Sequence, residues 1–266
     1  MDAERVREGI KTKHNMKNIV LVAALCLVFA ISSCTKTGPA GPTGPAGPIS
    51  TGTLTGYVST LDQYGFKVMS DLAGVTVRIS DSLGDSTTTD ATGKYTFANL
   101  KTGIYNITYS KPGYATILAQ DFSFLGGGTI IRNANISRYP SFSLFGIVSK
   151  DTTIATDPGM IVRGTDSADQ VARTYIVFGG STSLVSSSPG SYLYANTNTI
   201  KASSGVWNLF ITAQELHDNG LASGSTAYFV AYPIATGSPT YIDQATGRTV
   251  YTALGTPTSV ITVTVP

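Results

Sequence analysis

The sequence has few charged residues: Asp, Glu, Lys and Arg make up 13% of its 266 residues, about half of the usual share. The first 33 residues hold five of the 18 basic and three of the 16 acidic residues, so the rest carries 13 of each and is formally neutral. A neutral chain without a Lys/Arg cluster has no electrostatic attraction for a phosphate backbone. We therefore expect no nucleic-acid partner.

Metal-binding and catalytic side chains are also scarce. Beyond residue 33 the chain has one Cys, one His and one Glu, namely Cys34, His217 and Glu215. A zinc site needs three or four His or Cys ligands, so this count excludes one. A glycosidase needs two positioned carboxyl groups, no Gly-x-Ser-x-Gly motif is present, and His217 is expected in a solvated loop. The sequence predicts a protein that is not an enzyme and holds no cofactor.

Composition alone does not exclude a calcium site. Asp81, Asp85 and Asp90 flank adjacent predicted turns, and oxygen ligands on loops suit Ca²⁺. They do not follow the alternating Asp-x-Asp-x-Asp-Gly pattern, and Asp is a common turn residue. We keep these three as weak calcium candidates beside the expectation of no metal site.

An apolar run near the N-terminus has the length of a signal-peptide core. Ile19–Ile31 is an almost unbroken apolar run of 13 residues, too short to span a bilayer as a stable helix. It ends in Ser32-Ser33-Cys34, which resembles the lipobox of bacterial lipoproteins; the alternative is a buried helix with an incidental Cys. The resemblance implies a signal peptide over residues 1–33 and acylation of Cys34. Met16 is the expected start, although residues 1–15 could also be a long leader.

Acylation would hold the chain on a membrane, because several acyl chains bind a bilayer far more firmly than one. In the family's sorting rules an Asp after the cysteine retains lipoproteins on the inner membrane, and this chain has Thr35 there. The resemblance therefore implies the outer membrane, with the periplasmic or cell-surface face left open. Cys26 leaves with the leader, so the mature chain has no disulfide and depends on burial for its stability.

A short repeat follows the cysteine. Gly38–Ile49 consists of four Gly-Pro-x triplets, which resemble collagen. Four triplets are few for a triple helix, so the segment is expected to be a polyproline II spacer about 40 Å long. Residues 34–52 are predicted to form this linker, and a monomer is favoured over trimerisation through the repeat.

Short alternating runs separated by turn residues predict a first β-sandwich over residues 53–141. Asp90 and Gly93 are expected to form a hairpin turn. The predicted strands are Leu54–Thr60, Val75–Ser80, Lys94–Phe97, Gly103–Tyr109, Ala115–Asp121 and Ile130–Ile136.

The motifs of this region resemble the carboxypeptidase regulatory-like domain, a transthyretin-like sandwich. They are Thr55-Gly56-Tyr57-Val58, Leu72-Ala73-Gly74-Val75, Asp90-Ala91-Thr92-Gly93-Lys94-Tyr95, Gly103-Ile104-Tyr105 and Lys111-Pro112-Gly113-Tyr114. The resemblance implies that Tyr95, Phe97, Leu100 and Tyr105 pack in the core and carry no chemistry. The insert Asp62–Asp71 departs from the family pattern.

The strand pattern restarts and predicts a second sandwich over residues 142–266, which makes the chain all-β. Leu221–Tyr228 resembles the turn before the sixth strand of fibronectin type III-like domains, which implies that Tyr228 is a corner tyrosine bonded to the backbone. Ala213–Asn219 is expected to form a helical turn. The predicted strands are Ser143–Ser149, Met160–Arg163, Arg173–Phe178, Tyr192–Ile200, Val206–Thr212, Ala227–Pro233 and Ser259–Val265.

Aromatic side chains supply the weak candidates for ligand binding. Stacking platforms for sugars could come from Tyr139, Tyr192, Tyr194, Tyr241 and Tyr251, with Tyr192 and Tyr194 expected on one strand face. Packing on a sheet is the simpler expectation for strand tyrosines, and Trp207 is expected in the core. The sequence thus predicts a non-catalytic, membrane-anchored lipoprotein that acts as an adhesion or assembly module with a protein partner. The alternative is a glycan-binding accessory lipoprotein of a polysaccharide-uptake system.

Overall fold

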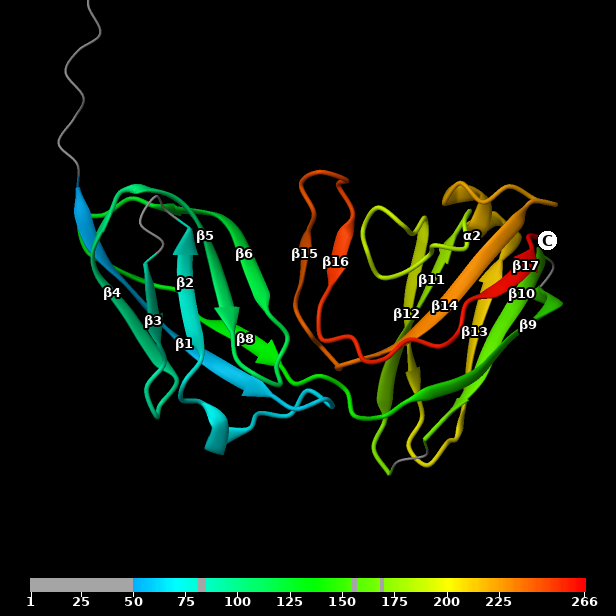
Figure 1. Ribbon diagram of the computed structural model, residues 1–266, viewed down its shortest axis with the longest axis horizontal. Helices are drawn as coiled ribbons and strands as arrows, with labels where there is room; N and C mark the ends of the chain where they lie inside the picture. The colour runs from blue at the N-terminus through cyan, green and yellow to red at the C-terminus, as the bar shows by residue number, and fades with distance from the viewer. Residues whose placement is uncertain (1–49, 81–84, 155–156, 168–169) are drawn as a thin grey trace, which may run out of the picture. The chain divides into compact units, whose positions relative to one another are not determined.

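The computed structural model describes residues 50–80, 85–154, 157–167 and 170–266. The predicted leader, Cys34 and the Gly-Pro-x repeat lie outside these residues, so the structure leaves the lipoprotein prediction as it stood. Within the described part of the chain, no helix is both long and apolar enough to cross a bilayer. The predicted all-β fold of tandem sandwiches is confirmed (Figure 1).

Two sheets form the first sandwich. One has the order β4-β1-β7, with β8 also paired to β1, and the other has the order β3-β2-β5-β6. A short 3₁₀ helix, η1 (Met69–Asp71), lies between β1 and β2. The strands are β1 (Thr51–Leu61), β2 (Thr76–Ser80), β3 (Ser86–Thr88), β4 (Lys94–Lys101), β5 (Gly103–Ser110), β6 (Ile117–Phe124), β7 (Thr129–Ile131) and β8 (Ala134–Ser137).

The core of this sandwich contains the residues that the motifs indicated. Tyr95, Phe97, Leu100 and Tyr105 are all buried there. The predicted turn is present as well: the Asp90 carboxylate accepts hydrogen bonds from the backbone N–H groups of Thr92 and Lys94, and Gly93 has φ +82°. The burial of these four side chains agrees with the alternation of apolar residues along the strands.

The expected strand over residues 130–136 is instead two strands, β7 and β8, which pair with successive parts of β1. Gly56 lies beside this break, and a Cβ there would lie 1.8 Å from the Arg132 carbonyl oxygen, so the close approach requires glycine. Between β7 and β8 the chain continues beside β1, and Asn133 Oδ1 accepts a hydrogen bond from the Tyr57 N–H at 2.9 Å. The short, polar β3 was not predicted, because three Ser and Thr residues carry no hydrophobic alternation.

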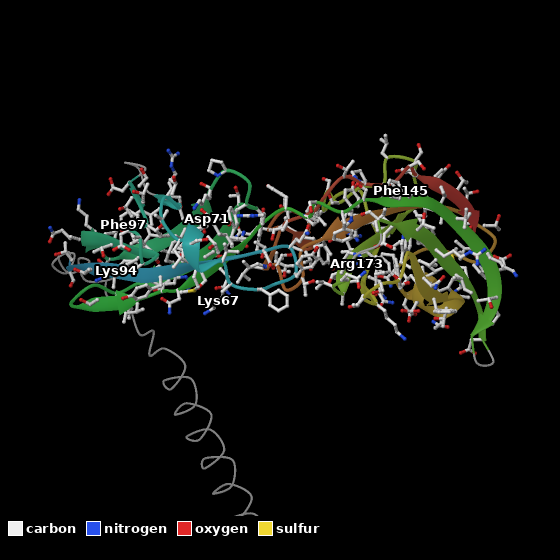
Figure 2. All side chains as sticks on the ribbon, turned by 90° about the horizontal axis from the view of Figure 1, so that it is seen from below. Lys67, Asp71, Lys94, Phe97, Phe145 and Arg173 are labelled. Atoms are coloured by element: carbon white, nitrogen blue, oxygen red, sulfur yellow. The ribbon has the colours of Figure 1, made fainter. Side chains whose placement is uncertain are left out.

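The second sandwich packs a sheet of order β13-β10-β9 against one of order β12-β11-β14-β17. Its main core contains Trp207, Leu209 and Ile211, which share one face of β13 as expected. Arg173, labelled in Figure 2, is also buried. The strands are β9 (Leu144–Ile154), β10 (Asp157–Asp166), β11 (Arg173–Gly180), β12 (Tyr194–Ile200), β13 (Val206–Thr212), β14 (Thr226–Ile234), β15 (Thr240–Ile242), β16 (Thr249–Tyr251) and β17 (Ile261–Thr264).

The expected helical turn is α2 (Ala213–Asp218). Thr212 and Glu215 form a reciprocal capping box at its start, and His217 Nε2 accepts a hydrogen bond from the Ser223 N–H at 3.0 Å. The expected tyrosine corner is not formed. The Tyr228 ring packs against a cluster of the four-stranded sheet that contains Ile176 and Phe178, and no hydrogen bond joins its hydroxyl to another described residue. Glu215 and His217 thus serve local structure.

Candidate functional site

The four-stranded sheet of the second sandwich is buried on both faces. Tyr175 and Val177 of β11 lie in the main core, whereas Ile176 and Phe178 lie in a separate cluster on the other face. A sheet with two apolar faces needs a cover on each. The cover of the second face comes from the segment between β11 and β12 and from a hairpin of β15 and β16.

The hairpin is formed by local turn chemistry. Thr240 pairs with Tyr251 and Ile242 with Thr249. At the tip, Asp243 Oδ2 accepts hydrogen bonds from the Thr246 N–H at 2.8 Å and from its hydroxyl at 2.6 Å. Gly247 follows with φ +69°, a conformation that suits glycine. This turn repeats the chemistry of Asp90 and Gly93 in the first sandwich.

Aromatic side chains hold the hairpin on the sheet. The Tyr251 ring packs edge-on against Phe178 with ring centroids 5.5 Å apart. Tyr192 donates its phenolic hydrogen to the Thr249 carbonyl at 2.5 Å. The Arg248 guanidinium lies 5.5 Å from the centre of the Tyr192 ring and donates to the Leu193 carbonyl. The position of the hairpin is therefore set by both packing and directed bonds.

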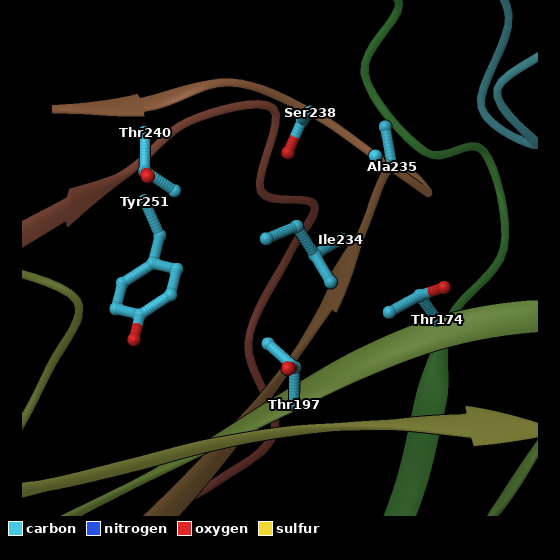
Figure 3. Close-up of a pocket in the computed structure, with 8 residues that line it drawn as sticks. Thr174, Thr197, Ile234, Ala235, Ser238, Thr240 and Tyr251 are labelled. Carbon is cyan, nitrogen blue, oxygen red and sulfur yellow. The ribbon is translucent and has the colours of Figure 1, made fainter.

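A hollow of about 250 Å³ opens where the hairpin leaves the sheet (Figure 3). Thr240 and Tyr251 come from the hairpin, and Thr174 and Thr197 come from the sheet. We call it the hydroxyl hollow. It is lined by Thr174, Thr197, Ile234, Ala235, Gly237, Ser238, Thr240 and Tyr251.

Several hydroxyl groups in the hollow are available to a ligand. Within the described part of the chain, neither the Thr197 nor the Thr240 hydroxyl makes a hydrogen bond, and both residues are exposed. The Tyr251 hydroxyl also makes none, and burial of the ring raises the pKa of this phenol. Thr174 shares a hydrogen bond of 2.8 Å with Thr236. None of the eight lining residues is charged, so the hollow offers neutral donors and acceptors beside one aromatic ring.

The structure separates the five candidate tyrosines. Tyr251 lines the hollow, and Tyr192 supports the hairpin behind it. Tyr194 is buried in the main core, which corrects the expectation that it shares a face with Tyr192: β12 begins only at Tyr194, so strand alternation does not extend to Tyr192. Tyr241 is half-buried in β15 and Tyr139 is 47% exposed, and both lie outside the hollow.

The calcium candidates are not brought together in the described part of the chain. Asp81 lies outside the described residues, and Asp85 is exposed. The Asp90 carboxylate is used by the turn, and the hydrogen bond from the Thr92 hydroxyl is the main cause that lowers its pKa. Within the residues that the structure describes, no three acidic, His or Cys side chains form a group that could hold a metal ion.

The threonines and Ser238 of the hollow were missed by sequence reasoning. Ser and Thr are frequent on exposed strand positions, so their presence alone does not indicate a site. The useful signal was the Asp-x-x-Thr-Gly-Arg stretch at residues 243–248, flanked by Thr-Tyr-Ile and Thr-Val-Tyr. It matches a hairpin turn, and recognising it would have placed Thr240 opposite Tyr251.

A search of the curated proteins gave no match to the chain. Among solved structures, the chain is similar to a proposed carbohydrate-binding protein from Bacteroides uniformis ATCC 8492. The two share 15% identity and a TM-score of 0.31, over 81% of this chain and 99% of that one. It is also similar to a DUF3823 family protein from Bacteroides ovatus ATCC 8483, at 13% identity and a TM-score of 0.29, over 82% of this chain and 100% of that one. Likeness at this level carries no conclusion about function.

The family comparison bears on the first sandwich. The model of the carboxypeptidase regulatory-like domain matches residues 67–137. That span includes η1 and the strands from β2 to β8. The predicted resemblance is confirmed, and the chain carries a carboxypeptidase regulatory-like domain.

Proposed function

We propose that this chain is a membrane-anchored, non-catalytic binding protein whose hydroxyl hollow takes part of a neutral glycan. The single observation that carries the proposal is the lining of the hollow, in which unpaired hydroxyls of Thr197 and Thr240 lie near the Tyr251 ring without any charged group. A sugar presents both hydroxyls and an apolar C–H face, so it can use both kinds of contact. A charged ligand would lose hydration there without gaining a counter-charge.

The size of the hollow fits a limited contact. Pockets that enclose a whole drug-sized ligand measure about 300–1,000 Å³, and this one measures about 250 Å³. A single sugar unit is the expected occupant, with the rest of the glycan lying outside. Weak binding is therefore expected, because few contacts offset the cost of ordering the ligand.

Membrane anchoring is supported by the lipobox-like Ser32-Ser33-Cys34 sequence after its apolar run. We propose acylation of Cys34, with the outer membrane as the destination. The non-catalytic role is supported by Glu215 and His217, which cap and stabilise α2 and its following turn. A fibronectin type III-like second sandwich is part of the same proposal, and its three- and four-stranded sheets support it.

Affinity gel electrophoresis on a panel of neutral polysaccharides tests the glycan proposal. The wild-type chain should be retarded on at least one polysaccharide. Thr197→Val should weaken binding about three- to tenfold, because it removes one hydroxyl and little volume. Thr199→Val is the matched control, because Thr199 lies two residues further along β12, is exposed and does not line the hollow.

Two outcomes would count against the proposal. If Thr197→Val and Thr199→Val are both retarded as strongly as the wild-type chain, the glycan binds outside the hydroxyl hollow. Absence of retardation on every polysaccharide would remove the glycan role and leave the adhesion or assembly module as the function to pursue.

A further inference from the structure

Large apolar side chains are exposed on the outer face of the three-stranded sheet in the second sandwich. Phe145 and Val148 of β9 are 52% and 47% exposed, and Val206 and Phe210 of β13 are 50% and 55% exposed. Phe145 is labelled in Figure 2. Single exposed apolar residues are ordinary, but several on one sheet face indicate an interaction surface.

The strand register places these residues on one face. Thr165 of β10 pairs with Phe145 on one side and with Val206 on the other. Two residues before Thr165 on β10, Arg163 pairs with Val148. Because adjacent strands lie about 4.8 Å apart, Phe145 and Val206 lie about 10 Å apart across the sheet.

The third row completes the face with a second cation. Ile161 pairs with Lys150 on β9 and with Phe210 on β13. Lys150 and Arg163 are both exposed, and neither has an ion-pair partner among the described residues. We call Phe145, Val148, Val206, Phe210, Lys150 and Arg163 the apolar–cationic face.

None of the acidic groups of these strands lies within the three rows. Asp166 is buried, and Asp151 pairs with buried Met160 and so belongs to the opposite side of the pleat. Asp157 is on the same side of the pleat as Ile161, but it lies four residues before it, at the start of β10 and outside the three rows. The three rows therefore carry two positive charges and no negative one.

This charge pattern indicates which kind of partner binds the apolar–cationic face. A second copy bound face to face would bring Arg163 and Lys150 against their own counterparts, which is unfavourable. An anionic partner would neutralise both cations. Two of the four apolar residues are valines, which partition into hydrocarbon but do not stack on sugar rings. Apolar side chains among cations, on a broad sheet surface, suit the headgroup region of an anionic bilayer.

We propose that the apolar–cationic face docks on a lipid bilayer with anionic headgroups. Phe145, Val148, Val206 and Phe210 would enter the interfacial layer, and Lys150 and Arg163 would contact headgroup phosphates. The proposal extends the membrane association proposed above, but it depends neither on acylation of Cys34 nor on the hydroxyl hollow. Its failure is therefore distinguishable from failure of the proposed function.

Vesicle co-sedimentation tests it with a chain that begins at Thr35, cannot be acylated at Cys34 and keeps the compact unit over Ile49–Pro266. The vesicles are phosphatidylcholine with or without about one third phosphatidylglycerol. We expect at least fivefold more bound protein on the anionic vesicles, with the excess lost at high salt, because salt screens exposed charges.

Two double variants examine the two parts of the face. Phe145→Ser with Phe210→Ser, and Lys150→Gln with Arg163→Gln, should each lower binding at least fivefold. The controls are Leu184→Ser, at a residue that is 80% exposed outside the face, and Lys201→Gln, at an exposed lysine. Each variant is compared by circular dichroism and thermal unfolding, so that loss of fold is recognised.

Three results would overturn the proposal. One is absence of binding to the anionic vesicles, and another is equal binding to both kinds of vesicle. The third is binding of the chain to polygalacturonate that both double variants abolish. This result would assign the face to an acidic polysaccharide.

Discussion

The phenol of Tyr192 donates a hydrogen bond of 2.5 Å to the backbone carbonyl of Thr249, 57 residues away in sequence. This bond joins the segment before β12 to the β15–β16 hairpin. Tyr251, two residues beyond Thr249, forms part of the wall of the hydroxyl hollow. The hollow therefore depends on the hairpin being held in this position.

Tyr192→Phe should loosen the hairpin without unfolding the sandwich. The substitution keeps the ring and its packing on Phe178, with centroids 4.9 Å apart, but removes the donor. A loss of about 1 kcal/mol is typical for one intramolecular hydrogen bond. Hydrogen exchange should accelerate in residues 240–251 and stay unchanged in β13. Unchanged exchange in the hairpin would show that aromatic packing alone holds it.

A buried ion pair should make the second sandwich sensitive to a single substitution. The side chains of Arg173 and Asp166 are fully buried, and Arg173 Nε donates to Asp166 Oδ2 at 2.6 Å. Arg173→Met leaves a buried carboxylate without its partner, which costs about 3–5 kcal/mol. Trp207, the single tryptophan of the chain, reports unfolding in urea by its fluorescence.

The matched control for Arg173→Met is the double variant Asp166→Leu with Arg173→Met. It removes both charges, and replacing a whole buried pair with apolar residues is often nearly neutral. The double variant should recover more than half of the lost stability. A double variant as unstable as Arg173→Met would show that the hydrogen bonds of Arg173 to the Ser204 and Val171 carbonyls matter more than the charge pair.

The first sandwich should lose stability in acid through Asp71. The hydrogen bond from Lys111 is the largest cause that lowers the pKa of this carboxyl, followed by the hydrogen bond from Tyr114. Because the pKa is lower in the folded than in the unfolded chain, the stabilisation is fully present above the unfolded value of about 3.9. It is lost as the pH falls through the folded pKa.

Asp71→Asn should therefore lower the melting temperature at neutral pH, and the difference from wild type should shrink below about pH 4. Asp85→Asn is the control, because the Asp85 side chain makes no hydrogen bond or ion pair with another described residue. Thermal melts from pH 2 to pH 7 give the comparison. A difference that stays constant over this range would contradict the assigned role of the Asp71 charge.

Cys34→Ser should release most of the chain from the membrane fraction, because serine at the lipobox cannot be acylated. Mass spectrometry of the wild-type mature protein should find three acyl chains on an N-terminal Cys34. An unmodified Cys34 in the mature wild-type protein would disprove the anchor. Residual membrane association of the serine variant, sensitive to salt, is expected from the apolar–cationic face.

Alternation was sufficient to locate most strands and the buried face of each. Trp207, Leu209 and Ile211 illustrate this, since every second residue of β13 lies in the core. Sequence reasoning failed where tertiary contacts overrode local pattern. Tyr192 and Tyr194 are two residues apart, yet they lie in different clusters because β12 begins only at Tyr194. At the break between β7 and β8, the Arg132 carbonyl approaches Gly56, which is distant in sequence, so local pattern could not reveal it.

The hollow was only partly predictable for the same reason. Tyr251 was a candidate as an aromatic residue, whereas Thr174 and Thr197 became part of a site only through the pairing of β11 with its neighbours. Hydroxyl residues on a strand resemble ordinary solvent-exposed positions until another element covers them. The partners that make them a site come from a hairpin more than 40 residues later in the chain.

Hydrogen exchange of the unacylated chain, with and without a mixture of neutral oligosaccharides, tests the central claim most directly. A glycan in the hydroxyl hollow should slow exchange in the segments 234–240 and 249–252, and at Thr174 and Thr197, while β13 exchanges as before. Protection confined to another part of the chain, or no protection by any oligosaccharide at millimolar concentration, would contradict the account.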